Sequence, residues 1–195
     1  VALAVVMGGT GTVLAAGDSI PGDALYPVKR ASERARLMFA VTDAQESDLR
    51  SGLLDRRVDE LEAVTRKGRQ QFVQSLGGEI ERYSHQVRSM AEAPVRRVIS
   101  VAVEDTYGPA PSAGPGTTLG VTPQMVMVRA DRLLRVHHQL AAMELQLRHV
   151  LEQLADSPAK SRLREVLEAV SADRLRAAQA LEQMDAAHMD VDRPS

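Results

Sequence analysis

Residues 20–30, Ile-Pro-Gly-Asp-Ala-Leu-Tyr-Pro-Val-Lys-Arg, divide the sequence into two parts of different character. Residues 1–17 carry no charge, whereas the chain after residue 30 is rich in charged and helix-forming residues. Pro21-Gly22-Asp23 predicts a turn, because proline presets φ and glycine readily takes a positive φ. Pro27 suits the first position of a helix, where its missing N–H is not needed. This stretch is therefore predicted to be a junction that ends one segment and begins the next.

The junction also carries a resemblance to a known family. Its Pro-Gly-Asp-x-Leu-Tyr-Pro-Val-Lys-Arg block is followed by Glu33-Arg34 and later by the helix-like run Asp55–Glu62. Together they resemble an uncharacterised bacterial extracytoplasmic helical domain family, in which such a block follows a membrane helix and some members are attached to anti-sigma-factor modules. The resemblance covers roughly residues 18–92 and implies location and architecture, but no known activity. The signature residues of the junction are Pro21, Gly22, Asp23, Leu25, Tyr26, Pro27, Lys29 and Arg30.

Composition predicts an all-α protein. Aromatic residues make up only 3% of the chain and tryptophan is absent, whereas compact sheets usually draw on aromatic and β-branched side chains. A net charge of −2 argues against a nucleic-acid-binding protein, which would present a basic face. The absence of cysteine excludes disulfides, iron–sulfur clusters and thiol catalysis.

Residues 1–17 are predicted to be a truncated membrane helix. As a helix they would span only about 24 Å, short of the ~30 Å hydrocarbon core. A signal segment cleaved near residues 15–17 is the alternative, and a buried strand or core helix is a third. Gly8, Thr12 and Ala16 recur every four residues, which would allow close helix packing in a homo-oligomer. The protein would then be a single-pass membrane protein with its helices outside the cytoplasm, or else a secreted one.

We expect a membrane-proximal helical domain over residues 18–107, with three or more helices. The first is predicted over 27–41, with Ala31, Ala35 and Met38 on its packing stripe. The second begins at a capping box over 43–46 and ends near Lys67, where Gly68 stops it. The third spans about 70–92. The predicted buried faces of the second and third helices are Leu54, Val58, Leu61 and Val64, and Val73, Leu76, Ile80, Tyr83, Val87 and Met90.

Four further expectations concern this domain. Gly77-Gly78 lies inside the third helix and indicates a break or bend there, since each glycine costs ~1 kcal/mol relative to alanine. Leu25 and Tyr26 are expected to be buried against the following helices. Lys29 and Arg30 are expected to be compensated by Asp23 or another acid, or alternatively to form a basic patch that faces lipid phosphates. Residues 95–103 are ambiguous between helix and strand.

A Pro/Gly-rich linker over residues 108–121 separates this domain from a predicted antiparallel helical hairpin over 122–190, with a frayed tail at 191–195. Thr122-Pro123 and Ser157-Pro158 each combine an N-cap residue with a proline at the first helical position. Apolar residues recur at heptad spacing along the first helix of the hairpin. This pattern suits either the chain's own core or a partner-binding seam. The seam consists of Leu133, Val136, Leu140, Met143, Leu147, Val150 and Leu154.

Candidate catalytic and metal sites are weak. Ser19 in Gly-Asp-Ser, and Asp185 three residues before His188, resemble elements of GDS-type esterases, but no strand–helix alternation would bring a triad together. His138 and His149 lie roughly 16 Å apart along a helix, too far to share a metal ion. Glu81 and His85 are one turn apart, and they would need ligands from another helix. We expect no catalytic, cofactor-binding or metal-binding residues.

The functional interpretation is therefore a regulatory or sensory protein-interaction role, with the anti-sigma-factor type implied by the resemblance. The alternative is a structural or adaptor helical protein of the cell envelope. Both interpretations expect a protein partner and a membrane contact through the N-terminal segment, and neither expects nucleic acid or a cofactor.

Overall fold

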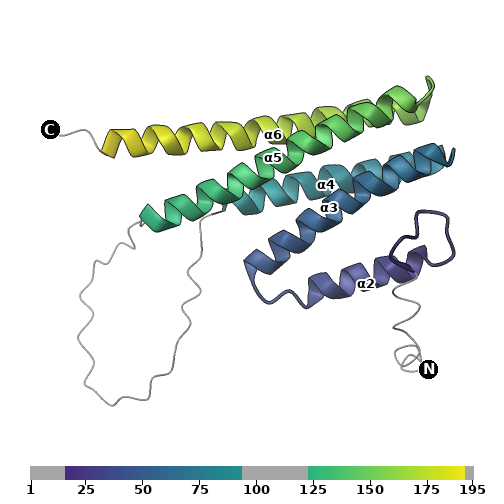
Figure 1. The fold of residues 1–195 in the computed structure, drawn as a ribbon, viewed down its shortest axis with the longest axis horizontal. Helices are drawn as coiled ribbons and strands as arrows, with labels where there is room; N and C mark the ends of the chain where they lie inside the picture. Colours follow the sequence, from purple (N-terminus) through teal and green to yellow (C-terminus); the bar gives the residue numbers. More distant parts are fainter. Residues whose placement is uncertain (1–15, 94–122, 192–195) are drawn as a thin grey trace, which may run out of the picture.

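The computed structural model describes residues 16–93 and 123–191, although only the backbone is described for 123–126 and 187–191 (Figure 1). These residues contain helices and no strand, which confirms the all-α prediction. The elements are α2 (Tyr26–Met38), α3 (Asp43–Arg66), the short 3-10 helix η1 (Gln70–Phe72), α4 (Val73–Glu92), α5 (Pro123–Gln153) and α6 (Pro158–Val191). The predictions on residues 1–15, on 95–103, on the linker at 108–121 and on the tail from 192 lie outside the described residues.

The four long helices pack around one hydrophobic core (Figure 1). α5 and α6 run in opposite directions and pack along each other, and α4 packs against both of them as well as against α3. The helical segments on either side of residues 94–122 therefore share a core instead of forming separate ones. The buried core residues of these helices include Leu54, Leu61, Val64, Leu76, Ile80, Val87, Leu163, Val166, Val170 and Ala177.

The heptad seam of α5 faces this core. All of its seven residues are buried, between 0% and 5% exposed: Leu133, Val136, Leu140, Met143, Leu147, Val150 and Leu154. Most of the predicted faces of α3 and α4 are buried as well, with Tyr83 and Met90 partly exposed. Because the α5 seam is covered by α3, α4 and α6 of the same chain, it belongs to the intrachain core.

α2 attaches to the bundle in an unusual way. It lies along the outer side of α3, at the lower edge of the molecule in Figure 1. Its two buried residues, Lys29 and Glu33, are both charged. Of the predicted packing stripe Ala31, Ala35 and Met38, only Ala35 is partly buried, and the other two residues are exposed. That expectation was wrong because α2 turns its polar side, not its apolar side, toward α3.

The ends of α3 are set by local chemistry. Thr42 is the N-cap, and its hydroxyl accepts a hydrogen bond from the Gln45 N–H at 3.2 Å. The predicted capping box therefore begins one residue earlier than expected. At the other end Gly68 has a φ of +68°, and the Arg69 N–H donates to the Val64 carbonyl at 2.7 Å. This is a Schellman motif, and it confirms Gly68 as the helix stop.

α4 continues through Gly77 and Gly78 without the break that the sequence suggested. Gly77 is buried against α6, where a Cβ atom would lie only 2.8 Å from Cγ2 of Val166. A Cβ atom added at Gly78 would approach only the guanidinium of Arg162, at 3.8 Å. Gly77 therefore permits the close approach of α4 and α6, which offsets the conformational cost of a helical glycine.

The glycine pair allows a matched test of this packing. Gly77→Ala should lower the free energy of unfolding by about 1–3 kcal/mol, because the added methyl group overpacks the contact with Val166. Gly78→Ala should raise it by up to ~1 kcal/mol through helix propensity. Urea denaturation measures both, and Val166→Ala in the Gly77→Ala background should restore part of the loss. Equal effects at the two positions would contradict the described contact.

A buried ion cluster at the junction

The turn before α2 is held by Asp23 and Arg69. One carboxylate oxygen of Asp23 accepts from the Ile20 N–H at 3.0 Å, and the other accepts from the Arg69 guanidinium at 2.7 Å. The Ile20 N–H and then Arg69 hold the pKa of Asp23 below its usual value. Gly22 has a φ of +94°, and a Cβ atom there would lie 3.0 Å from the Phe72 ring. The turn predicted from Pro21-Gly22-Asp23 is therefore present. It is held against Arg69 and Phe72, which follow the end of α3.

Behind this turn, α2, α3 and α4 bring together three basic residues, three acidic residues and one tyrosine. Lys29, Arg57 and Glu60 are buried, as is Glu33, and the others are partly exposed. The charges of the six ionisable groups balance. We call this set the junction cluster, and it consists of Tyr26, Lys29, Arg30, Glu33, Arg57, Glu60 and Glu79.

Arg57 lies at the centre of the junction cluster. Its side chain is 0% exposed, and its guanidinium forms ion pairs with Glu33 of α2 and with Glu60 of its own helix. Its Nε lies 3.5 Å from Glu79 of α4. Arg30 extends the network, at 2.9 Å from Glu79 and 3.2 Å from Glu33. The Arg57 guanidinium thus contacts all three helices that meet at the junction.

Lys29 and Tyr26 connect the start of α2 to the same network. Nζ of Lys29 lies 2.6 Å from Glu60, and it donates to the Ser19 carbonyl at 2.9 Å. The Tyr26 hydroxyl donates to Glu60 at 3.1 Å and accepts from Arg57 at 2.9 Å. Burial, reinforced by the Glu60 charge, raises the pKa of Tyr26 above its ordinary value. The two positive charges of the first helical turns are therefore compensated by Glu60, Glu79 and Glu33, and not by Asp23.

The expectation that Leu25 is buried was wrong. Leu25 is 36% exposed and Tyr26 is only partly buried. The inward side of the first turn of α2 is occupied by polar groups, so that Leu25 is left on the outer side. The alternative of a lipid-facing basic patch formed by Lys29 and Arg30 does not hold either, since both side chains point into the junction cluster.

Burying charged groups is costly, and four of the six are buried here, so the junction cluster is better explained by specificity than by net stability. Glu33 and Glu60 each have one carboxylate oxygen without a hydrogen bond, and these atoms are balanced by charge alone. A buried ion network often contributes less than well-packed apolar side chains would, whereas removing one partner leaves an uncompensated charge. In the placement of α2 that the structure shows, the three basic and three acidic members pair with one another. The cluster thus fixes the position and register of α2.

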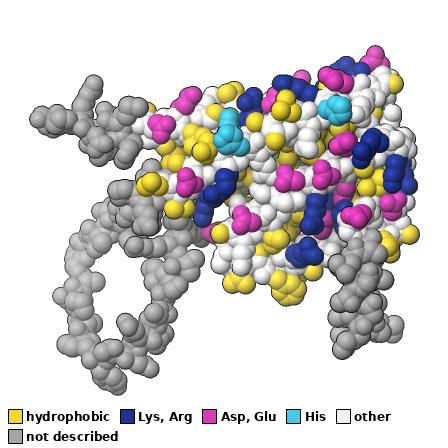
Figure 2. Space-filling model, in the orientation of Figure 1, with side chains coloured by type: hydrophobic (Ala, Val, Ile, Leu, Met, Phe, Trp, Pro, Cys, Tyr) yellow, Lys and Arg dark blue, Asp and Glu magenta, His cyan; other side chains and the backbone are white. Residues whose placement is uncertain are grey.

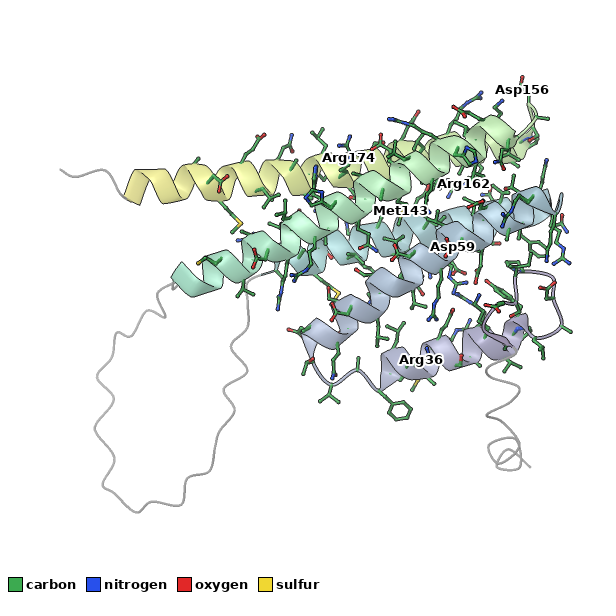
Figure 3. The ribbon with its side chains drawn as sticks, viewed as in Figure 1. Arg36, Asp59, Met143, Asp156, Arg162 and Arg174 are labelled. Carbon is green, nitrogen blue, oxygen red and sulfur yellow. The ribbon has the colours of Figure 1, made fainter. Side chains whose placement is uncertain are left out.

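Sequence reasoning also missed the polar links between the long helices. Asp173 of α6 accepts from Arg88 at 2.9 Å and from Ser84 at 3.0 Å, both on α4. Arg162 and Arg174 of α6 (Figure 3) pair with Glu81 of α4 and Glu144 of α5, each at 2.8 Å. The only signal for them in the sequence was a polar residue at helical spacing among apolar ones.

The weak catalytic and metal candidates are not assembled into a site. Ser19 is buried and its hydroxyl donates to the Ala16 carbonyl at 2.7 Å. Asp185 is exposed, and the side chain of His188 lies outside the described ones. Glu81 is engaged by Arg162, and His138 and His149 are exposed. Within residues 16–93 and 123–186, no group of three or more potential metal ligands comes together.

The fold and the junction cluster together define an all-α bundle whose first helix is docked by buried ions. A family model, described as "Domain of unknown function (DUF5667)", matches residues 18–191, and the chain belongs to this family. The match takes in α5 and α6, beyond the limit of roughly residue 92 expected from the resemblance, in agreement with the shared core. Comparisons with curated proteins and with solved structures gave no match. None of the helices in the described part of the chain is long and apolar enough to cross a bilayer.

Two adjacent arginines test the junction cluster. Arg57→Ala should lower the free energy of unfolding by about 3–5 kcal/mol, because it leaves Glu33 and Glu60 buried without their partner. The side chain of Arg56 is 48% exposed and lies 3.7 Å from Glu33. Arg56→Ala should therefore lower the free energy of unfolding by only ~0–1 kcal/mol. Chemical denaturation of both variants gives the comparison. Similar costs would show that the two arginines are equivalent and that the cluster is not buried.

Tyr26 gives the junction a dependence on alkaline pH. Above about pH 10, the ordinary pKa of tyrosine, the unfolded chain loses the phenolic proton while the folded chain retains it, because the folded pKa is raised. The free energy of unfolding should therefore fall as the pH rises through this range. Tyr26→Phe should make that fall shallower, as measured by urea denaturation at successive pH values. Tyr83→Phe is the control for losing a hydroxyl elsewhere, and parallel curves for wild type and Tyr26→Phe would contradict the assignment.

Proposed function

We propose that this chain is the extracytoplasmic helical domain of a single-pass membrane protein with a regulatory or sensory protein-interaction role. The observation that supports it most is the way in which the end of the uncharged N-terminal stretch is fastened to the bundle. Ala16, Ser19 and Ile20 are buried, and Ile20 belongs to the hydrophobic core. Lys29 of the junction cluster holds the Ser19 carbonyl.

This attachment suits a protein that transmits a change of state. Coupling between two sites needs a continuous physical connection whose arrangement both sites can bias. Here Ser19 contacts Lys29, Lys29 contacts Glu60 and Glu60 contacts Arg57, which reaches α4 through Glu79. A passive tether would not require such a connection. The resemblance of the junction block to the family that includes anti-sigma-factor fusions supports the more specific version, in which the bundle controls a regulatory module on the other side of the membrane.

The location is tested by labelling in cells that express the whole protein. The 195 residues contain no cysteine, so Gln146→Cys on the exposed side of α5 introduces one reporter into them, and the unsubstituted protein gives the background labelling. We expect a membrane-impermeant maleimide to label it in intact cells as strongly as in permeabilised ones, with a cytoplasmic cysteine protein as the negative control. Labelling only after permeabilisation would contradict the extracytoplasmic placement.

The regulatory role is separated from the structural alternative in the same cells. Deleting the gene should change a defined set of transcripts, and the wild-type gene should restore them. Lys29→Met, which removes the link to Ser19 and Glu60, should restore them only in part even where the protein accumulates normally. A deletion that alters the envelope but leaves transcription unchanged would favour the structural or adaptor role.

A further inference from the structure

The outer side of α2 is apolar, although its inner side is charged. Val28 and Ala31 are exposed along the helix, and Met38, Phe39 and Val41 at its end are 82%, 80% and 88% exposed. Figure 2 shows hydrophobic side chains at the lower edge of the molecule, where Figure 1 places α2. Water-exposed apolar residues clustered in this way mark an interaction surface. Lys29, Arg30 and Glu33 hold the helix in the orientation that exposes them.

The arrangement of charge around this surface is that of a helix at a membrane interface. Val28, Ala31 and Met38 recur at helical spacing on one stripe, and the exposed Arg34 lies beside it, whereas Arg36 (labelled in Figure 3) lines the groove between α2 and α3. Interfacial helices bury an apolar face at the boundary between headgroups and acyl chains, while flanking basic residues reach the phosphates. In a helix packed on its own protein the apolar stripe faces the core, and α2 has the opposite orientation.

The uncharged residues that precede α2 in the sequence favour a bilayer over a second protein as the partner of this surface. The uncharged residues 1–17 end immediately before the turn that leads into α2, and Ser19 of that turn contacts Lys29 of the helix. If this stretch enters a membrane, α2 is the first folded element at its surface. α2 also lies at the edge of the bundle, with α3 between it and α6 (Figure 1), so that a flat surface can approach it.

We propose that the outer face of α2, centred on Val28, Ala31, Met38 and Phe39, lies in the headgroup–acyl boundary of the bilayer, with Arg34 directed toward lipid phosphates. This inference rests on the membrane placement in the proposed function. It adds a second contact with the membrane, through which lipid packing or surface charge acts on the junction cluster from the opposite side of the same helix.

The absence of tryptophan from the chain allows a direct test. Phe39→Trp, and as a matched control Leu145→Trp on α5 at 66% exposure in the wild type, are introduced into the full chain. Each variant is reconstituted in vesicles of phosphatidylethanolamine and phosphatidylglycerol, with and without brominated acyl chains. We expect the tryptophan emission of the Phe39→Trp variant to shift to the blue and to be quenched several-fold more strongly by brominated lipid than that of the Leu145→Trp variant. Met38→Trp provides a second reporter if Phe39→Trp alters the circular dichroism spectrum.

The outcomes separate this inference from the proposed location. A chain that floats with the vesicles but shows equal, weak quenching in both variants overturns the α2 contact and leaves the membrane anchor in place. A chain that does not float overturns both. A blue shift in the Phe39→Trp variant that is insensitive to brominated lipid and grows with protein concentration means that a second copy covers α2, which also overturns the lipid contact.

Discussion

The side chain of Arg57 is the interaction on which the N-terminal part of this protein depends. It is fully buried, permanently charged, and placed where α2, α3 and α4 meet. Its position is tolerable only because Glu33, Glu60 and Glu79 surround it, and these in turn are neutralised by Lys29 and Arg30. An apolar junction would allow α2 to slide along α3 at small cost. A balanced set of buried charges does not, because each shift would leave a charge without its counterion.

The rest of the bundle relies on a different physical principle. The helices from α3 to α6 bury a continuous apolar core, which contributes most of the driving force for folding. Polar contacts within it are few and specific, such as Asp173 with Arg88 and Ser84. Gly77 brings α4 and α6 closer than a larger residue would allow. The bundle is thus stabilised by burial, and α2 is positioned on it by electrostatics.

Composition indicated the all-α class. Helical periodicity predicted most of the buried faces of α3 and α4 and the seam of α5, because apolar residues at helical spacing usually form a packing face. The turn at Gly22 and the end of α3 at Gly68 were predictable for a different reason. Both depend on a glycine with a positive φ, which is a local property of the backbone. The junction cluster was not predictable in this way. Pairing Lys29 with Glu60 or Glu33 with Arg57 requires contacts between residues that are more than twenty positions apart, and no periodicity encodes them. The prediction of a buried Leu25 failed because it assumed that α2 would turn its apolar side inward.

The shared core also bears on how the chain can be divided. The part of the chain that ends at Ala93 and the part that begins at Pro123 contact each other through α3, α4, α5 and α6. The part that holds α3 and α4 and the part that holds α5 and α6 thus carry complementary apolar faces. Neither part would bury all of its apolar face without the other, so the interior of the bundle depends on the two parts folding against each other.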